Sequence, residues 1–291
     1  MINVMDIREE ALRQHKKLRG KIAVELKDQL DSQEKLSIYY TPGVAAVSSY
    51  IAEHPEEARD YTWLNNSVAV ISDGSAVLGL GDIGPYGALP VMEGKAMLFK
   101  HFANIDAVPI ILDVHTSDEI VAAVKAIAPS FGGINLEDIA APICFEVEDR
   151  IKEALSIPVM HDDQHGTAVV VLAGLINAMK VTGRSLKSCR IVCVGAGAAG
   201  TAIMKLINQY AGPEILAVDS KGIVSSGRDD LNEEKRKLLE FTNKEDIGGS
   251  LQDALKGADI FIGVSKAGLL TAEMVKSMSK DPIIFAMANP T

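Results

Sequence analysis

Short apolar runs alternate with helix-like segments through the second half of the chain. Four of these runs predict buried strands, at residues 188–194, 214–219, 258–264 and 282–287. The segments between them predict helices at residues 201–210, 251–256 and 271–279. Strands that alternate with helices indicate a parallel sheet with helices on both faces. Residues 166–291 are therefore predicted to form a doubly wound α/β domain.

The first half of the chain has the same kind of alternation, so residues 1–165 are predicted to form a separate α/β domain. The charged residues 1–35 look helical. Strands are expected further on at residues 67–72, 107–114 and 157–160, and helices at residues 117–128 and 145–155. Residues 77–81 are predicted to pair with residues 67–72 as a hairpin. The glycine- and proline-rich residues 82–90 are predicted to form a loop, and an apolar helix is expected from Glu93 to Lys100.

The stretch Ile157 to Met179 has a polar segment, His161-Asp162-Asp163-Gln164-His165, between an apolar strand and a long apolar helix predicted from Thr167 to Val181. Burying two adjacent carboxylates costs several kcal/mol each unless a cation or a dense set of hydrogen bonds compensates. A helix N-cap plus a solvated aspartate is the simpler interpretation. A second acidic pair, Glu137-Asp138, also lies between apolar flanks. Together the two pairs predict a divalent-metal site with oxygen ligands.

Gly195, Gly197 and Gly200 form the pattern G-x-G-x-x-G between the predicted strand 188–194 and the predicted helix 201–210. Asp219 lies 19 positions after Gly200, at the end of the next predicted strand. In a dinucleotide-binding fold this arrangement places the pyrophosphate at the helix N-terminus and the acidic side chain on the ribose hydroxyls. A tight turn without a ligand is the alternative.

Composition narrows the classes of partner. The net charge of −10 argues against nucleic acid and against an anionic membrane surface. The longest apolar run is shorter than the roughly 18 residues that a membrane span needs, and the N-terminus is too charged for a signal peptide. Cys144, Cys189 and Cys193 lack zinc-site spacing and are expected to be buried free thiols. We therefore expect a cytoplasmic protein.

Two further side chains can be interpreted in two ways. Lys95 lies near the start of the predicted helix 93–100, where the helix dipole disfavours a cation. It is either a lysine whose ammonium group reaches solvent or a desolvated lysine that can act as a base. Tyr40 precedes the turn predicted at Pro42 and Gly43, a place where a tyrosine more often serves packing than chemistry.

From about Ile38 to Thr291 the sequence resembles the malic enzymes, specifically the short bacterial and archaeal type. The resemblance is carried, in order, by the strings YYTPGVA, LGLGDIGPYGALPVMEGK, FGGINLEDI, IPVMHDDQHGTA, GAGAAG, VDSKG and ANPT. It implies an N-terminal α/β malic domain followed by a Rossmann-type domain. It also implies oxidative decarboxylation of L-malate to pyruvate and CO2 with NAD or NADP and with Mg²⁺ or Mn²⁺, in a homodimer.

The resemblance also implies roles for individual residues. The family's pattern assigns Glu137, Asp138 and Asp163 as metal ligands, Asp162 as an acid beside the metal, Lys95 as general base, Tyr40 as general acid and Asn289 as a contact of malate. The chemistry suits these residue types, because carboxylates are hard ligands for Mg²⁺ or Mn²⁺ and leave positions open for a 2-hydroxy acid.

The sequence departs from the family in two places. The larger eukaryotic enzymes have an arginine before the LGLGD string that binds a substrate carboxylate, whereas residues 74–77 here are GSAV. The family also continues well beyond ANPT, so we expect this chain to be C-terminally incomplete.

Two alternative functions and the choice of cofactor stay open. A malolactic-type enzyme would use the same site without releasing NADH, and a catalytically silent dinucleotide-binding fragment would turn over no malate. The choice between NAD and NADP is also open, because Asp219 favours NAD whereas Lys221 could meet a 2′-phosphate.

Overall fold

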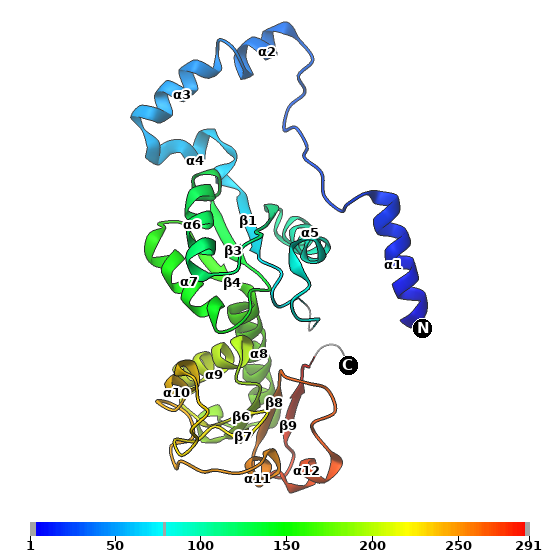
Figure 1. The fold of residues 1–291 in the computed structure, drawn as a ribbon, viewed down its shortest axis with the longest axis vertical. Helices are drawn as coiled ribbons and strands as arrows, with labels where there is room; N and C mark the ends of the chain where they lie inside the picture. Colours follow the sequence, from blue (N-terminus) through cyan, green and yellow to red (C-terminus); the bar gives the residue numbers. More distant parts are fainter. Residues whose placement is uncertain (1–3, 78–79, 289–291) are drawn as a thin grey trace. The chain divides into compact units, whose positions relative to one another are not determined.

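The computed structural model describes residues 4–77 and 80–288 and divides into two compact units, each built around its own sheet (Figure 1). The first unit consists of Met1–Gly74, Ile83–Glu137 and Asp149–Val159. The second consists of Ser75–Asp82, Asp138–Glu148 and Met160–Thr291. The chain therefore passes from one unit to the other several times, once between the adjacent residues Glu137 and Asp138.

The first sheet has the strand order β2-β1-β3-β4. Its strands are β1 (Ser67–Ser72), β2 (Asp106–Ile111), β3 (Gly133–Leu136) and β4 (Val159–His161). β1 pairs in parallel with β2 on one side and with β3 on the other. Both edges of β1 are thus occupied, and the hairpin predicted between residues 67–72 and 77–81 is wrong. In the described part of residues 77–81 no strand forms, and residues 78 and 79 lie outside the described residues.

Figure 1 shows helix α5 on one side of this sheet and α6 and α7 on the other. The α-helices in this half of the sequence are α1 (Val4–Leu18), α2 (Gln33–Tyr39), α3 (Val44–Glu53), α4 (Ala58–Tyr61), α5 (Gly84–Ala103), α6 (Ser117–Ile127) and α7 (Ile143–Ala154). Short 3₁₀ helices cover Pro55–Glu57, Trp63–Asn65 and Ala128–Ser130. Residues 21–32 are not helical, so the prediction of helix over residues 1–35 holds only in part.

Helix α5 begins nine residues earlier than the sequence predicts. The predicted loop over residues 82–90 is wrong, because the helix starts at Gly84 and contains Pro90. Pro85 fits the first helical turn, where a backbone N–H has no intrahelical partner to lose. Lys95 therefore lies in the interior of a long helix rather than near its start. The helix dipole has little effect there, because it acts within the terminal turns.

The second sheet has the strand order β7-β6-β5-β8-β9. Its strands are β5 (Arg190–Val194), β6 (Glu214–Asp219), β7 (Gly222–Ile223), β8 (Ile260–Gly263) and β9 (Ile283–Ala286). All pairs are parallel except the two-residue β7, which runs antiparallel to β6. The helices are α8 (Asp162–Thr182), α9 (Ala198–Ala211), α10 (Glu233–Leu238), α11 (Leu251–Leu255), α12 (Ala272–Ser277) and a 3₁₀ helix at Leu186–Ser188. The doubly wound prediction is confirmed.

Alternate residues of the central strand β5 supply two different cores. Ile191 and Cys193 face α8 and α9, whereas Val192 and Val194 pack with α11 on the opposite face. Both faces of the strand are buried, which explains its unbroken apolar sequence. Cys144, Cys189 and Cys193 are buried free thiols, as predicted. Burial raises the pKa of Cys144 and of Cys193 to about 12, which keeps both thiols protonated and unreactive.

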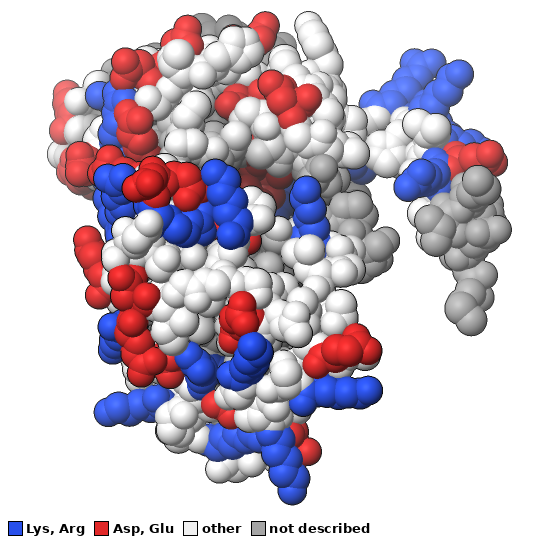
Figure 2. Space-filling model, turned by 60° about the horizontal axis from the view of Figure 1, so that its bottom comes forward, with Lys and Arg blue, Asp and Glu red and all other residues white. Residues whose placement is uncertain are grey.

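Helix α8 begins at Asp162, five residues before the predicted start, so Asp162 and Asp163 belong to its first turn. Within the described residues, α8 is long and apolar enough to cross a membrane by length and composition alone. One such helix is weak evidence for a membrane span. Only 22% of its most apolar stretch is buried, and α8 contributes four buried side chains to the core it shares with α9. On the face shown in Figure 2, acidic and basic side chains are interspersed.

Candidate active site

Lys95 and Glu137 form an ion pair within the first unit. Lys95 is on α5, and Glu137 directly follows β3, at the carboxyl end of the strand. The Nζ atom of Lys95 lies 2.9 Å from Oε1 of Glu137. The side-chain amide of Asn135 donates a hydrogen bond of 2.9 Å to the other carboxylate oxygen. Glu137 is buried, with 5% of its surface exposed. Lys95 is thus neither free in solvent nor isolated among apolar groups.

Asp138 and Asp163 are joined within the second unit. The backbone N–H of Asp138 donates a hydrogen bond of 2.8 Å to Oδ2 of Asp163. Asp138 itself has a φ of +53°, a left-handed conformation that aspartate tolerates better than most residues. The bond joins one member of each predicted acidic pair, although the two pairs are separated by more than twenty residues in sequence.

The first turn of α8 is shaped around Asp162. A Cβ atom on Gly166 would lie 2.4 Å from Oδ1 of Asp162, so the carboxylate occupies space that only a glycine leaves open. The amides of this first turn have no partner within the helix, and the helix dipole there favours negative charge. Acidic residues are therefore favoured over basic ones in this turn.

His161, the residue before α8, is fully buried. Burial lowers the pKa of its imidazole, which favours the neutral ring. Its Nδ1 atom lies 3.7 Å from Oδ2 of Asp163, beyond hydrogen-bond distance, and neither ring nitrogen has a hydrogen-bond partner among the described residues. Nothing in the sequence distinguishes this histidine from the polar segment around it.

Among the described residues, no hydrogen bond or ion pair links Tyr40 to the other predicted site residues. Tyr40 is the C-cap residue directly after α2, and 67% of its surface is exposed. Among the described residues its hydroxyl has no hydrogen-bond partner, whereas the neighbouring Tyr39 donates a bond of 2.7 Å to Asp28. Asn289 lies outside the described residues.

The glycine fingerprint forms the turn between β5 and α9. Gly195 has a φ of +118°, which favours glycine. A Cβ atom on Gly200 would lie 1.6 Å from the carbonyl oxygen of Gly195, so this glycine allows close packing of helix and strand. A Cβ atom on Gly197 would meet nothing within 4 Å, and the N-terminus of α9 has no side-chain cap. The open first turn suits an anionic group.

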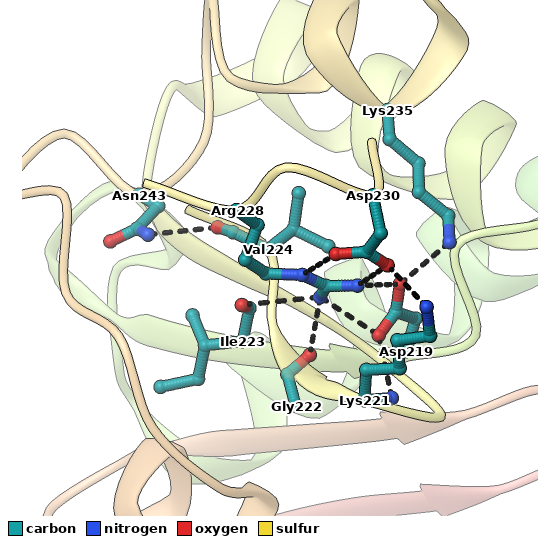
Figure 3. A network of polar contacts seen from close by, with 9 residues as sticks. All are labelled: Asp219, Lys221, Gly222, Ile223, Val224, Arg228, Asp230, Lys235 and Asn243. Carbon is teal, nitrogen blue, oxygen red and sulfur yellow. Dashed lines mark hydrogen bonds and ion pairs between the residues drawn. The ribbon is translucent and has the colours of Figure 1, made fainter. Parts of the chain in front are cut away.

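Asp219 ends β6 and is the centre of a polar network (Figure 3). Arg228 binds it with two hydrogen bonds of 2.9 Å each, and the Nζ atom of Lys235 lies 2.6 Å from Oδ2. Arg228 also binds Asp230, and Lys221 lies 3.0 Å from the same carboxylate. Burial alone would raise the pKa of Asp219, but the hydrogen bonds from Arg228 and Lys235 outweigh it and lower that pKa to about 2.

This network changes the interpretation of Asp219. The sequence predicts a carboxylate that binds ribose hydroxyls, and the structure shows one that already binds two cationic side chains. Three cations, Lys221, Arg228 and Lys235, accompany the two carboxylates Asp219 and Asp230. Sequence reasoning missed Arg228 and Lys235, because nothing in their spacing from Asp219 indicates that they fold back onto it.

An apolar cavity of about 290 Å³ lies at the carboxyl ends of β5, β8 and β9. Its lining includes Val194, Phe261, Ser265, Leu270 and Ala286. In doubly wound sheets, ligands bind outside the carboxyl ends of the strands. The cavity, the fingerprint turn and Asp219 all lie on that side of the sheet.

Comparisons with known proteins agree with this arrangement. Residues 17–152 match the family described as the malic enzyme N-terminal domain, and residues 164–291 match the malic enzyme NAD-binding domain. The bifunctional malic/malolactic enzyme of Bacillus subtilis (strain 168) is 54% identical over 287 residues, which are 98% of this chain and 70% of that protein. The NAD-dependent malic enzyme of Geobacillus stearothermophilus is also 54% identical, over 93% of this chain and 57% of its own length.

A solved structure gives the same result for the fold. The crystal structure of the NAD-dependent malic enzyme of Thermotoga maritima matches 97% of this chain and 75% of that chain. The TM-score is 0.94 and the sequence identity is 51%. Two family domains that together match most of the chain, and relatives at this identity, establish its membership. The chain belongs to the malic enzyme family.

Proposed function

We propose that this chain catalyses the oxidative decarboxylation of L-malate to pyruvate and CO2, with NAD or NADP as hydride acceptor. The observation that carries the proposal is the Lys95–Glu137 ion pair at the carboxyl end of β3, directly before Asp138, which binds Asp163. These are the residue types the reaction needs, in a member of the malic enzyme family whose second unit has the dinucleotide fingerprint.

We also propose that Glu137, Asp138 and Asp163 hold a divalent cation, Mg²⁺ or Mn²⁺. All three offer carboxylate oxygens, the hard ligands that these ions prefer. Glu137 and Asp138 are buried, where charge compensation is worth most. When bound, the cation would draw charge from Glu137 and polarise the oxygen atom on C2 of malate.

Lys95 is proposed to accept the proton of the C2 hydroxyl at Nζ while hydride leaves C2 for the nicotinamide ring. Its ammonium group must first lose a proton, and the ion pair with Glu137 opposes that loss as long as Glu137 keeps its full charge. Loss of CO2 from the oxidised intermediate leaves an enolate. Tyr40 then donates its phenolic proton to C3, a role supported by the sequence resemblance alone.

The basic side chains around Asp219 support the use of NADP as well as NAD. An isolated aspartate would repel a 2′-phosphate, but Arg228 and Lys235 neutralise Asp219. A 2′-phosphate beside Asp219 would meet the ammonium groups of Lys235 and of Lys221, which also pairs with Asp230. Curated relatives include both NAD-dependent and NADP-dependent enzymes.

One observation favours a second activity. The Bacillus subtilis relative is named as a bifunctional malic/malolactic enzyme. A chain with the same activity would convert part of the malate to lactate without releasing reduced cofactor. The homodimer, the boundary at residue 165 and the cytoplasmic location stay predictions.

The test is turnover of L-malate with Mn²⁺ and either cofactor, with reduced nicotinamide, pyruvate and lactate measured together. We expect reduced nicotinamide and pyruvate in equal amounts, and no turnover by Asp163→Ala or after chelation of the metal. Lactate without reduced cofactor would establish the malolactic activity. Binding of NADH without any turnover of malate would refute the proposal and favour a silent dinucleotide-binding protein.

A further inference from the structure

Glu148, on α7, is a buried carboxylate that the proposed reaction does not use. Only 3% of its surface is exposed. A charged group in such a place is unfavourable unless hydrogen-bond donors surround it. Three such donors come from one short segment of chain, and that segment contains Asp162 and Asp163.

Three groups of residues 161–165 bind the Glu148 carboxylate. The backbone N–H of His161 donates to Oε1 at 3.0 Å, and the side-chain amide of Gln164 donates to Oε2 at 3.1 Å. The Nε2 atom of His165 lies 2.8 Å from Oε1 and 3.0 Å from Oε2. Because a carboxylate only accepts, Nε2 of His165 carries the proton in this contact. Bonds to a charged acceptor are stronger than those between neutral groups.

The same two stretches of chain meet at a second point. Residues 138–148 run from Asp138 into α7, and residues 161–165 open α8. At one end, the N–H of Asp138 binds Oδ2 of Asp163. At the other end, Glu148 binds the residues on either side of Asp162 and Asp163. All of these residues belong to the second unit.

The first turn of α8 is therefore attached at two points. The hydrogen bond between Asp138 and Asp163 restrains it at one point. The contacts with Glu148 restrain it at the other and hold the turn against α7. The directions of the Asp162 and Asp163 carboxylates are then determined by the backbone of the turn.

We propose that Glu148 is a positioning residue for the metal-binding carboxylates, acting through Gln164, His165 and the backbone of His161. This inference rests on the proposed metal site at Glu137, Asp138 and Asp163. Glu148 itself faces the donors of α8 and is not proposed as a ligand. Partners that orient metal ligands in this way typically contribute about 10- to 100-fold in metal affinity.

The test measures the affinity for Mn²⁺ alone, from the signal of free Mn²⁺ in electron paramagnetic resonance, and separately the affinity for NADH. We expect Glu148→Gln to raise the Mn²⁺ dissociation constant by about 10- to 100-fold. The NADH dissociation constant and the melting temperature should stay close to those of the unaltered protein. Glu153→Gln, the same change at an exposed position of α7, is the matched control and should alter none of the three.

Two variants of His165, which donates a hydrogen bond to Glu148, keep the test decisive if Glu148→Gln folds poorly. His165→Gln retains a side-chain N–H that can reach Glu148, whereas His165→Leu retains none. We expect the leucine variant to weaken Mn²⁺ binding and the glutamine variant to restore most of it. A side chain that served packing alone would not discriminate between donor and apolar replacements in this way.

The outcomes separate the inference from the proposal it rests on. If the unaltered protein binds Mn²⁺, Asp163→Ala does not, and Glu148→Gln binds it normally, the positioning role is overturned while the metal site stands. If Glu148→Gln weakens Mn²⁺ and NADH binding equally and lowers the melting temperature, Glu148 has only a structural role. If neither the unaltered protein nor Asp163→Ala binds Mn²⁺, the metal proposal fails and this inference with it.

Discussion

Glu137 and Asp219 occupy equivalent places in the two sheets, each at the carboxyl end of a parallel strand. Glu137 is buried and Asp219 is partly buried, and both bind a cationic side chain. They differ in their neighbours. Asp219 and Asp230 are outnumbered by Lys221, Arg228 and Lys235, whereas Glu137 is followed in the chain by Asp138, which binds the carboxylate of Asp163.

The difference shows how one position in a fold can serve ligands of opposite charge. An excess of carboxylates suits a divalent cation, and an excess of cations suits the phosphates of a dinucleotide. The strand end provides the location, because ligands of parallel sheets bind there. The charge of the ligand that fits there is determined by side chains from other parts of the chain.

The largest effect should come from breaking the Lys95–Glu137 pair. Lys95→Met should reduce malate oxidation by about 10²- to 10⁴-fold, because it removes the proposed general base. The rate of reduced-nicotinamide formation at saturating malate measures this. Lys100→Met is a control on the same helix, because Lys100 forms an exposed ion pair with Asp106. A near-normal rate in the Lys95 variant would contradict the role of base.

The next test separates two glycines of the fingerprint. Gly200→Ala should destabilise the fold by about 1–3 kcal/mol through overpacking against the Gly195 carbonyl. Gly197→Ala should leave stability unchanged, because a Cβ atom there meets nothing, but should weaken NADH binding by obstructing the pyrophosphate. Chemical denaturation and NADH titration measure the two effects. Equal loss of stability in both variants would show that Gly197 has a packing role.

A smaller effect should follow from Arg228→Met. The folded-state pKa of Asp219, about 2, is below its ordinary value of 3.8, so this carboxylate adds stability above about pH 4 and loses that contribution as the pH falls toward 2. The variant should lose about 1–2 kcal/mol near neutral pH after allowance for solvent screening. Unfolding free energies at several pH values measure the loss, which should shrink below pH 4.

The exposed pair of Arg13 with Glu10 provides the control for that series. Arg13→Met removes the same charge from a pair on the surface of α1, where solvent screens the interaction. We expect no measurable change in unfolding free energy at any pH. A loss in Arg228→Met that does not shrink in acid would mean that packing, rather than the charge of Asp219, accounts for it.

The smallest effect should be on cofactor choice. Lys235→Gln should weaken NADP binding by about tenfold, the worth of one hydrogen bond to a charged group, and should change NAD binding little. Lys237→Gln is the control on the same helix, because Lys237 pairs with Glu233 and Glu234 instead. Equal effects on both cofactors would remove Lys235 from the proposed 2′-phosphate contact.

The second sheet could be predicted from sequence more fully than the first. β6 was predicted with its observed bounds, Glu214–Asp219, and β5, β8 and β9 within two residues at each end. These strands are short and largely apolar, and the glycine fingerprint fixes the place of one of them in the fold. The two-residue β7 was missed, because so short a pairing leaves no pattern.

For the first sheet, the strand pairing predicted from sequence is wrong. Residues 77–81 follow β1 closely and have an apolar pattern, so a local hairpin was the natural prediction. The observed partner β2 begins more than thirty residues after β1 ends, and no local pattern encodes such a distant parallel pairing. The start of α5 was missed because Pro85 and Pro90 lie in its first two turns, where proline is otherwise a helix-ending signal.

The candidate site, like the fold, could be predicted from sequence only in part. The acidic pairs could be predicted from their apolar flanks, and the role of Lys95 from the resemblance. The structure joins Lys95 to Glu137 and Asp138 to Asp163. The residues that support the site, Glu148, Arg228 and Lys235, could not be found from sequence. Their function depends on which segments fold together. The sequences around them do not differ from those of other charged helices and loops.

The division of the chain at Glu137 and Asp138 also constrains the order in which the protein folds during synthesis. The first unit has all of its residues once Val159 has left the ribosome. Residues 75–82 and 138–148 have been made by then, but they belong to the unit that the remaining chain completes. Domains generally fold in the order of synthesis. We therefore expect the segment from Asp138 to Glu148 to fold after α8 has been synthesised, because residues 161–165 supply hydrogen-bond donors to the buried Glu148 carboxylate.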